Sequence, residues 1–240
     1  MSHDPYSPPE SELTTDGAGS AYVGGTGLFD IERALSEGWG ATWANFPLWL
    51  GVGIVAFVLS LLSVITIIGA IFALPVLLYG WIFFSLNMSR GTAQFSDLFA
   101  GFSRYGRALI QMLGFSLLMG LVGAGINSIT YLGQIMGNTT IEALGWLVYL
   151  VLYLTVFPRL LLAQFYLVDR DAGPIEALKR SWQATAPQKL RAVGLFLCLI
   201  VVSLIGVLVL LIGIVPAQVI GYLVWVSAYR QIEGDPAPAS

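Results

Sequence analysis

Six stretches of this chain are apolar and nearly free of charge, and each approaches the length of about 20 residues that a helix needs to cross a bilayer. The chain is 57% hydrophobic and 10% charged, whereas about a quarter of the residues of a soluble domain are charged. Backbone groups in lipid must bond to one another, which favours helices. The sequence therefore predicts an all-α integral membrane protein with six spans, at about 48–68, 71–89, 108–129, 143–168, 192–212 and 215–229.

The connections between spans predict three helical hairpins. Only Ile68, Gly69 and Ala70 separate the first two spans, and only Gly213 and Ile214 separate the last two. The third and fourth spans are joined by a loop at 130–142 that carries one acid and no base.

The basic residues fix the expected orientation. All eleven lie at or near span ends that can be assigned to one side, which the positive-inside rule makes cytoplasmic. An even number of spans then puts both termini in the cytoplasm. These residues are Arg33, Arg90, Arg104, Arg107, Arg159, Arg170, Lys179, Arg180, Lys189, Arg191 and Arg230.

An amphipathic segment is expected before each hairpin, at 28–46, 94–105 and 174–186. The first and last units also match in sequence: Ala34, Leu35 and Trp39-Gly40-Ala41-Thr42 recur as Ala177, Leu178 and Trp182-Gln183-Ala184-Thr185. Both copies begin on the same side, so the duplication is parallel. A third, diverged unit is expected between them.

Trp39 and Trp182 are expected at headgroup level, where an amphipathic ring is favoured. The segments that carry them are predicted to lie in the cytoplasmic interface. Contact with membrane lipids is the simpler interpretation, and a protein-binding face is the alternative.

The two ends of the chain, 1–27 and 233–240, are predicted to be disordered tails because they lack an apolar core. Asp4 to Pro9 is rich in proline and is either a plain linker or a peptide for a groove in a soluble partner. Much of the acidic charge lies in these tails, and the net charge is −3. Nucleic acid is therefore not expected as a partner.

The sequence offers no constellation for catalysis. The one histidine, His3, lies in the N-terminal tail, and the one cysteine, Cys198, lies within an apolar run. Carboxylates do not pair inside the spans, and the glycines follow no phosphate-loop or dinucleotide pattern. We therefore expect no metal, no cofactor and no enzymatic activity.

Arg159 is the candidate site residue. It precedes Asp169 by ten positions, about 15 Å along a helix, which places it below the cytoplasmic interface. One interpretation is simple snorkelling. The other is a structural ion pair with Glu176 or Glu32, favoured by Pro158, which leaves the carbonyl of residue 154 without its helical donor.

Small residues at four-residue spacing predict close helix packing. Either intramolecular packing or a homo-oligomer face explains them. The first stripe is Ser116, Gly120, Ala124 and Ser128, and the second is Gly213, Ala217 and Gly221.

The run from Arg159 to Asp169, followed by Pro174 to Thr185, resembles the cytoplasmic signature of the YciC-like bacterial inner-membrane proteins. It is also similar to the membrane domain of some glycerophosphoryl diester phosphodiesterases. Asp97 to Phe102 resembles the helix before their middle hairpin. The resemblance implies a six-span fold in a bacterial inner membrane, without phosphodiesterase chemistry because the catalytic domain is missing.

Three functions follow as hypotheses. The first is a non-enzymatic scaffold or accessory subunit that binds other membrane proteins or a second copy of itself. The second is a transporter of small solutes or lipids, against which the few polar residues inside the spans count. The third, a membrane enzyme, has the least support.

Overall fold

The computed structural model describes residues 27–208 and 214–235, and within these ranges the chain is helical with no strand. Five helices are long and apolar enough to cross a membrane. They confirm the coarse prediction of an all-helical, multi-pass membrane protein. The five run over Phe46–Ile65, Ile68–Arg90, Tyr105–Ile126, Thr139–Asp169 and Pro174–Val207.

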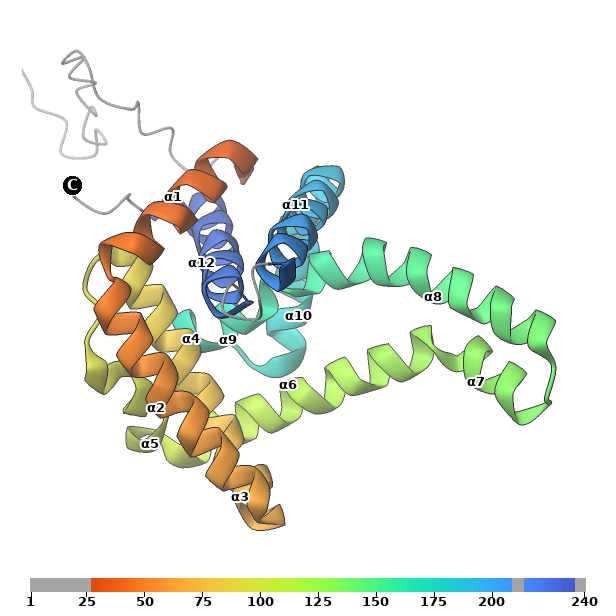
Figure 1. The fold of residues 1–240 in the computed structure, drawn as a ribbon, viewed down its shortest axis with the longest axis horizontal. Coiled ribbons are helices and arrows are strands. Elements are labelled where there is room, and N and C mark those ends of the chain that lie inside the picture. Colours follow the sequence, from red (N-terminus) through yellow and green to blue (C-terminus); the bar gives the residue numbers. More distant parts are fainter. Residues whose placement is uncertain (1–26, 209–213, 236–240) are drawn as a thin grey trace, which may run out of the picture.

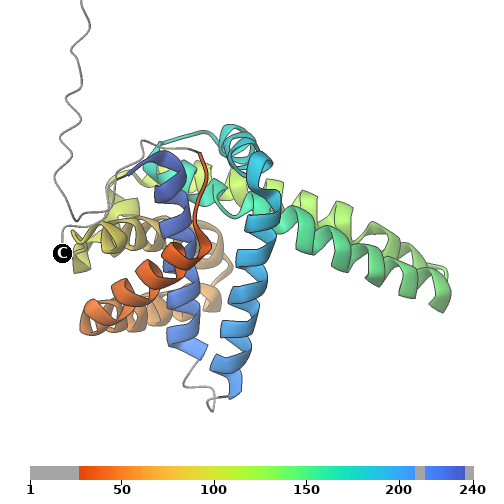
Figure 2. The same cartoon turned by 90° about the horizontal axis from the view of Figure 1, so that it is seen from above.

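Three hairpins diverge from a common base and point in different directions (Figures 1 and 2). The first consists of α2 (Phe46–Ile65), α3 (Ile67–Phe72) and α4 (Leu74–Arg90). The second consists of α6 (Tyr105–Ile126), α7 (Ser128–Ile135) and α8 (Thr139–Leu160), with α9 (Ala163–Asp169) continuing α8. The third consists of α11 (Lys189–Leu208) and α12 (Ile214–Glu233).

The turns of the first two hairpins are more helical than the sequence indicated. Thr66 caps α3 by accepting the amide of Gly69, so the expected sharp break at 68–70 is a short helix. The expected loop at 130–142 holds α7 and the Asn138 cap of α8. The break expected at 213–214 lies only partly within the described residues, which resume at Ile214.

Short helices precede each hairpin. They are α1 (Ile31–Ala44), then η1 (Phe95–Phe99) with α5 (Ala100–Ser103), and α10 (Pro174–Thr185), which η2 (Ala186–Gln188) follows. The middle segment was expected as one amphipathic helix at 94–105. It is instead a 3-10 turn and one α-turn, with Leu98 buried and its three phenylalanines exposed.

α1 and α10 dock through small residues rather than through their large apolar ones. Ala34, Gly38 and Thr42 are buried in α1, while Trp39 is 55% exposed. In α10 the buried residues are Ala177, Ser181 and Thr185, each 143 positions later, and Trp182 is exposed. Small residues on the packing faces allow the helix backbones to approach closely. The two tryptophans therefore remain on the outer surface.

α12 covers the sixth predicted span and forms the centre of the fold. It packs against α1, α4 and α11. Val224, Val226 and Ala228 are all fully buried. α12 is not one of the five apolar spans, because polar residues occupy its last turn, including Arg230 and Glu233.

Candidate functional site

The second helices of the three hairpins end at one place. α4 ends at Arg90, α9 at Asp169 and α12 at Glu233. A residue with left-handed backbone follows each end: Gly91 (φ 75°), Asp171 (φ 53°) and Gly234 (φ 75°). Such a residue lets a chain leave a helix sharply. Three helix C-termini therefore converge with similar local geometry.

Three arginines join these helix ends in a cycle, which we call the arginine junction. Arg90 Nη2 lies 2.8 Å from Asp169 Oδ1, which joins α4 to α9. Arg170 Nη2 lies 3.0 Å from Glu233 Oε2, which joins α9 to α12. Arg230 Nη1 donates to the carbonyl of Ser89, which joins α12 back to α4. Each hairpin thus binds the next.

Two tyrosines orient the carboxylates of the junction. The hydroxyl of Tyr229 donates to Asp169 Oδ2 at 2.9 Å, and that of Tyr166 donates to Glu233 Oε1 at 2.8 Å. The two rings meet edge to face, with centroids 5.0 Å apart. Hydrogen bonds to an ionised acceptor are stronger than neutral ones, so the tyrosines hold both acids in place.

The charges of the junction balance. Arg90 and Arg170 pair with Asp169 and Glu233, and Asp235 Oδ2 supplies the third carboxylate, 2.6 Å from Arg90 Nη2. Arg230, bound to the carbonyl of Ser89, supplies the third positive charge. Cations are also favoured beside the carbonyl ends of helices. The hydrogen bond from Arg170 to Tyr229 is the largest cause that raises the pKa of Arg170, with burial opposing it. Arg170 therefore keeps its charge at physiological pH, and the junction is a neutral, self-contained network.

Glu233 and Asp235 correct the prediction for the C-terminal end. The sequence assigned 233–240 to a disordered tail, but residues 233–235 are held by Arg170 and Arg90. The tails at 1–26 and 236–240 lie outside the described residues. A short polar segment next to a helix end can be ordered by ion pairs with distant residues, and the local sequence pattern does not indicate such pairs.

A neighbouring contact ties α6 to the same segment. Arg107 Nη2 lies 2.8 Å from Asp171 Oδ2, and Gln111 donates to Asp171 Oδ1 at 2.9 Å and to the carbonyl of Ala172. The segment from Asp169 to Asp171 therefore contacts α4, α6 and α12 at once.

Arg159 contacts α10, but through different chemistry from that expected. Its Cζ lies 3.4 Å from the centroid of the Trp182 ring. Its Nη2 donates to the carbonyl of Trp182 at 3.1 Å, and its Nε to Thr185 Oγ1 at 3.4 Å. Ser181 in turn donates to the carbonyl of Arg159 at 2.6 Å. A cation over an indole face is an attractive arrangement.

The expected ion pair of Arg159 does not form within the described part of the chain. Glu176 pairs with Arg180 instead, one helical turn away, with Nη2 and Oε1 2.6 Å apart. Glu32 is exposed on α1, a helix that packs on α12 rather than on α8. Pro158 is buried within α8, which ends two residues later, before α9 begins.

The two stripes of small residues have different environments. Ser116, Gly120, Ala124 and Ser128 are all exposed along α6 and its end, and a Cβ built on Gly120 would meet nothing within 4 Å. In the second stripe Ala217 is buried and a Cβ on Gly221 would lie 3.9 Å from Leu199 of α11. Gly213 lies outside the described residues.

Sequence reasoning missed the pairing within the arginine junction. Its one usable signal was the consecutive charges Asp169-Arg170-Asp171 directly after a span. Among the residues that the structure describes, no group of three or more His, Cys, Asp or Glu side chains is arranged to hold a metal ion.

Comparison with known proteins gives one match. A family model described as a domain of unknown function, DUF7847, matches residues 87–231, which is more than half of the chain and includes five of the six residues of the junction cycle. No curated protein and no solved structure matches the chain.

Proposed function

This chain belongs to the DUF7847 family, a domain of unknown function, and we propose that it is a non-enzymatic membrane scaffold, an accessory subunit of a bacterial inner-membrane complex. It uses the projecting hairpin α6–α8 to bind another membrane protein or a second copy of itself.

The exposure of that hairpin is the observation that carries the proposal. α6 and α8 project away from the other helices and are joined at their far end by α7 (Figures 1 and 2). In the most apolar stretch of α6 only 11% of the residues are buried, compared with 44% in Ile68–Arg90. Large apolar surfaces of this kind are covered by lipid or by a partner.

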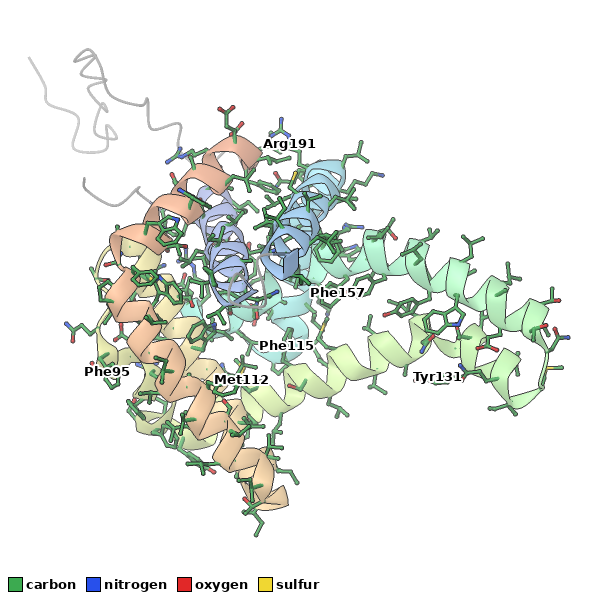
Figure 3. The ribbon with its side chains drawn as sticks, viewed as in Figure 1. Phe95, Met112, Phe115, Tyr131, Phe157 and Arg191 are labelled. Carbon is green, nitrogen blue, oxygen red and sulfur yellow. The ribbon has the colours of Figure 1, made fainter. Side chains whose placement is uncertain are left out.

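The side chains along the hairpin support a partner. Tyr131 lies toward the far end and Phe157 at the base, where it packs with Phe196 of α11 (Figure 3). Between them, the open surface at Gly120 allows another helix to approach closely. The neutral arginine junction supports the same proposal, because its charges bind one another and fix the hairpin at its base.

We further propose that the chain spans the membrane six times with both termini in the cytoplasm, α12 being the sixth span. The hairpin ends around α3 and α7 carry no basic residue, whereas the arginine junction and α10 lie at the opposite ends of the hairpins. This distribution supports a cytoplasmic location for the junction.

The docking of the short helices supports three related units arranged in a ring. Each short helix packs on the second helix of the preceding hairpin. In α1, a Cβ on Gly38 would lie 2.5 Å from Val224 of α12; in η1, the carbonyl of Leu98 would lie 1.8 Å from a Cβ on Gly80 of α4. In α10, Ser181 bonds to Arg159 of α8. The first of these contacts closes the ring, since α1 rests on the last hairpin.

A hydrogen bond that occurs at matching positions of α1 and α10 adds to this proposal of duplication. Thr42 Oγ1 donates to the carbonyl of Gly38 at 2.8 Å, and Thr185 Oγ1 donates to that of Ser181 at 2.8 Å. A relationship to the YciC-like group stays a prediction, since the description of DUF7847 assigns no activity.

Purification from native membranes in mild detergent tests the scaffold proposal. We expect the wild-type chain to elute with a stoichiometric partner or as an oligomer of itself. Gly120→Trp should abolish that assembly by blocking the open surface of α6. Gly53→Trp, which adds the same bulk at a position of α2 where a Cβ would also meet nothing within 4 Å, is the matched control and should leave it intact. A lone monomer in all three preparations would overturn the proposal.

A further inference from the structure

A groove of about 390 Å³ opens between the diverging helices of the second hairpin and the helix α10 that docks at their base. Val122 of α6 and Val156 and Leu160 of α8 form apolar walls, and Leu178 of α10 adds to them. The volume falls within the range of small-ligand sites, about 300–1,000 Å³. An apolar chain would fit this lining.

One cation lines the groove and a second lies beside the lining. Lys179 lines the groove and is exposed. Arg159 is not part of the lining, but its guanidinium lies on the ring of Trp182, which is. Neither cation is in an ion pair within the described part of the chain. The acid of α10, Glu176, is occupied by Arg180.

A cation below the interface without a counter-charge is costly in a membrane. Arg159 receives only partial compensation, from a carbonyl, a hydroxyl and an indole face. A phosphate group would complete it, because a guanidinium matches phosphate oxygens in geometry and charge. The ligand must then combine an anionic phosphate with an apolar chain.

We propose that this groove binds an anionic phospholipid. Its phosphate lies between Arg159 and Lys179, and one acyl chain lies along Val122, Val156 and Leu160. α10 is the amphipathic helix of the third unit, so in this proposal Lys179 lies at headgroup level, Arg159 lies just below it, and the groove extends toward the hydrocarbon. The lipid would hold the second hairpin to α10.

This site goes beyond the scaffold proposal and is tested on the purified chain alone. The full-length protein is delipidated in a mild non-ionic detergent and titrated with dioleoyl phosphatidylglycerol, dioleoyl phosphatidylcholine or inorganic phosphate. Bound lipid is counted by native mass spectrometry, and thermal stability is followed in parallel. Both lipids carry the phosphate, but the choline of phosphatidylcholine adds a positive charge that would lie near Arg159 and Lys179. We therefore expect phosphatidylglycerol to bind about tenfold more tightly than phosphatidylcholine.

Lys179→Gln is the first variant, because Lys179 is exposed and its loss leaves the fold intact. It should remove most of the preference for phosphatidylglycerol, and Arg159→Gln with Lys179→Gln should remove all of it. Lys189→Gln is the matched control, since it removes the same charge from a lysine that is also exposed but lies outside the groove lining, and it should keep the preference. Val156→Phe should weaken the binding of both lipids, because the larger side chain fills part of the groove.

Equal binding of the two lipids by the wild-type chain would overturn the proposal, as would an equal loss in Lys189→Gln. If inorganic phosphate alone stabilises the protein as much as phosphatidylglycerol does, the site binds a free anion and the lipid assignment is wrong. None of these results depends on whether a protein partner binds α6, so the two proposals fail separately.

Discussion

Arg170 and Glu233 join two hairpins, with Nη2 and Oε2 3.0 Å apart at the ends of α9 and α12. The sequence predicted either snorkelling or an ion pair for Arg159 and named no partner for Arg170. In the structure both arginines bind neighbouring helices. Arg170 binds carboxylates and a tyrosine, and Arg159 binds α10 through an indole ring and hydrogen bonds.

Asp169→Asn should destabilise the protein. The Asp169 side chain is 13% exposed and binds Arg90, Arg170 and Tyr229. Loss of its charge leaves Arg90 dependent on Asp235, and we expect a cost of about 1–3 kcal/mol in the free energy of unfolding. Unfolding in mixed detergent micelles measures it. Glu32→Gln, at an exposed acid outside any ion pair of the described residues, is the control and should cost less than about 0.5 kcal/mol.

Truncation separates the ordered part of the C-terminal segment from the rest. Removal of 236–240 should leave the midpoint of thermal unfolding unchanged, because the ion pairs of Glu233 and Asp235 remain. Removal of 233–240 deletes both acids and leaves Arg170 with Asp169 and Tyr229, so the midpoint should fall by about 2–4 °C for a cost near 1 kcal/mol. Identical midpoints for the two truncated chains would show that these ion pairs contribute nothing.

Gly38→Val should detach α1 from α12. A Cβ at Gly38 would lie 2.5 Å from Val224 Cγ2 and 2.8 Å from the Val224 amide nitrogen, so the two helices must separate. Overpacking of this kind costs about 1–3 kcal/mol. Limited proteolysis at Arg33 reports the detachment as faster cleavage. Gly40→Val, where a Cβ meets nothing within 4 Å, carries the same change in helix propensity and should be cleaved at the wild-type rate.

Trp182→Leu and Trp39→Leu compare equivalent positions of the two matching units. Trp182 holds Arg159 on its ring, whereas Trp39 contacts Trp43 with centroids 5.7 Å apart. We expect Trp182→Leu to cost more, by the cation–π contribution of about 0.5–2 kcal/mol. Thermal unfolding in one detergent compares them. If the variant at Trp39 is equally or more destabilised, the contact of Arg159 with the ring contributes no net stability.

Reporter fusions test the proposed topology. Enzymes that are active only in the cytoplasm should report activity when fused after Ser240 or inserted after Asp171, because Asp171 and the last described residue, Asp235, both pair with arginines. The same reporter at Gly137, in the turn between α7 and α8, should be inactive. An external C-terminus would contradict six spans and leave α12 as a buried helix that does not cross.

Much of the fold was readable from hydropathy, because lipid forces the backbone to satisfy its own hydrogen bonds. The spans at 48–68 and 108–129 agree with α2 and α6 to within a few residues, and 192–212 agrees with α11 as far as Leu208. The helical spacing of apolar residues around Trp39 and around Trp182 correctly predicted two short helices. A local period of about 3.6 residues is sufficient for such predictions.

The tertiary structure alone decided which faces meet and which charges pair. The large apolar residues of α1 attracted attention in the sequence, yet Gly38 and its small neighbours make the contact, because close packing is governed by shape rather than hydrophobicity when lipid is equally apolar. The paired charges come from three hairpins: Arg90, Asp169, Arg170 and Glu233. Their order along the chain does not indicate which residue pairs with which. Sequence determined that these charges lie at helix ends, since lipid excludes them from the middle. Only the convergence of three helix C-termini made them into one network.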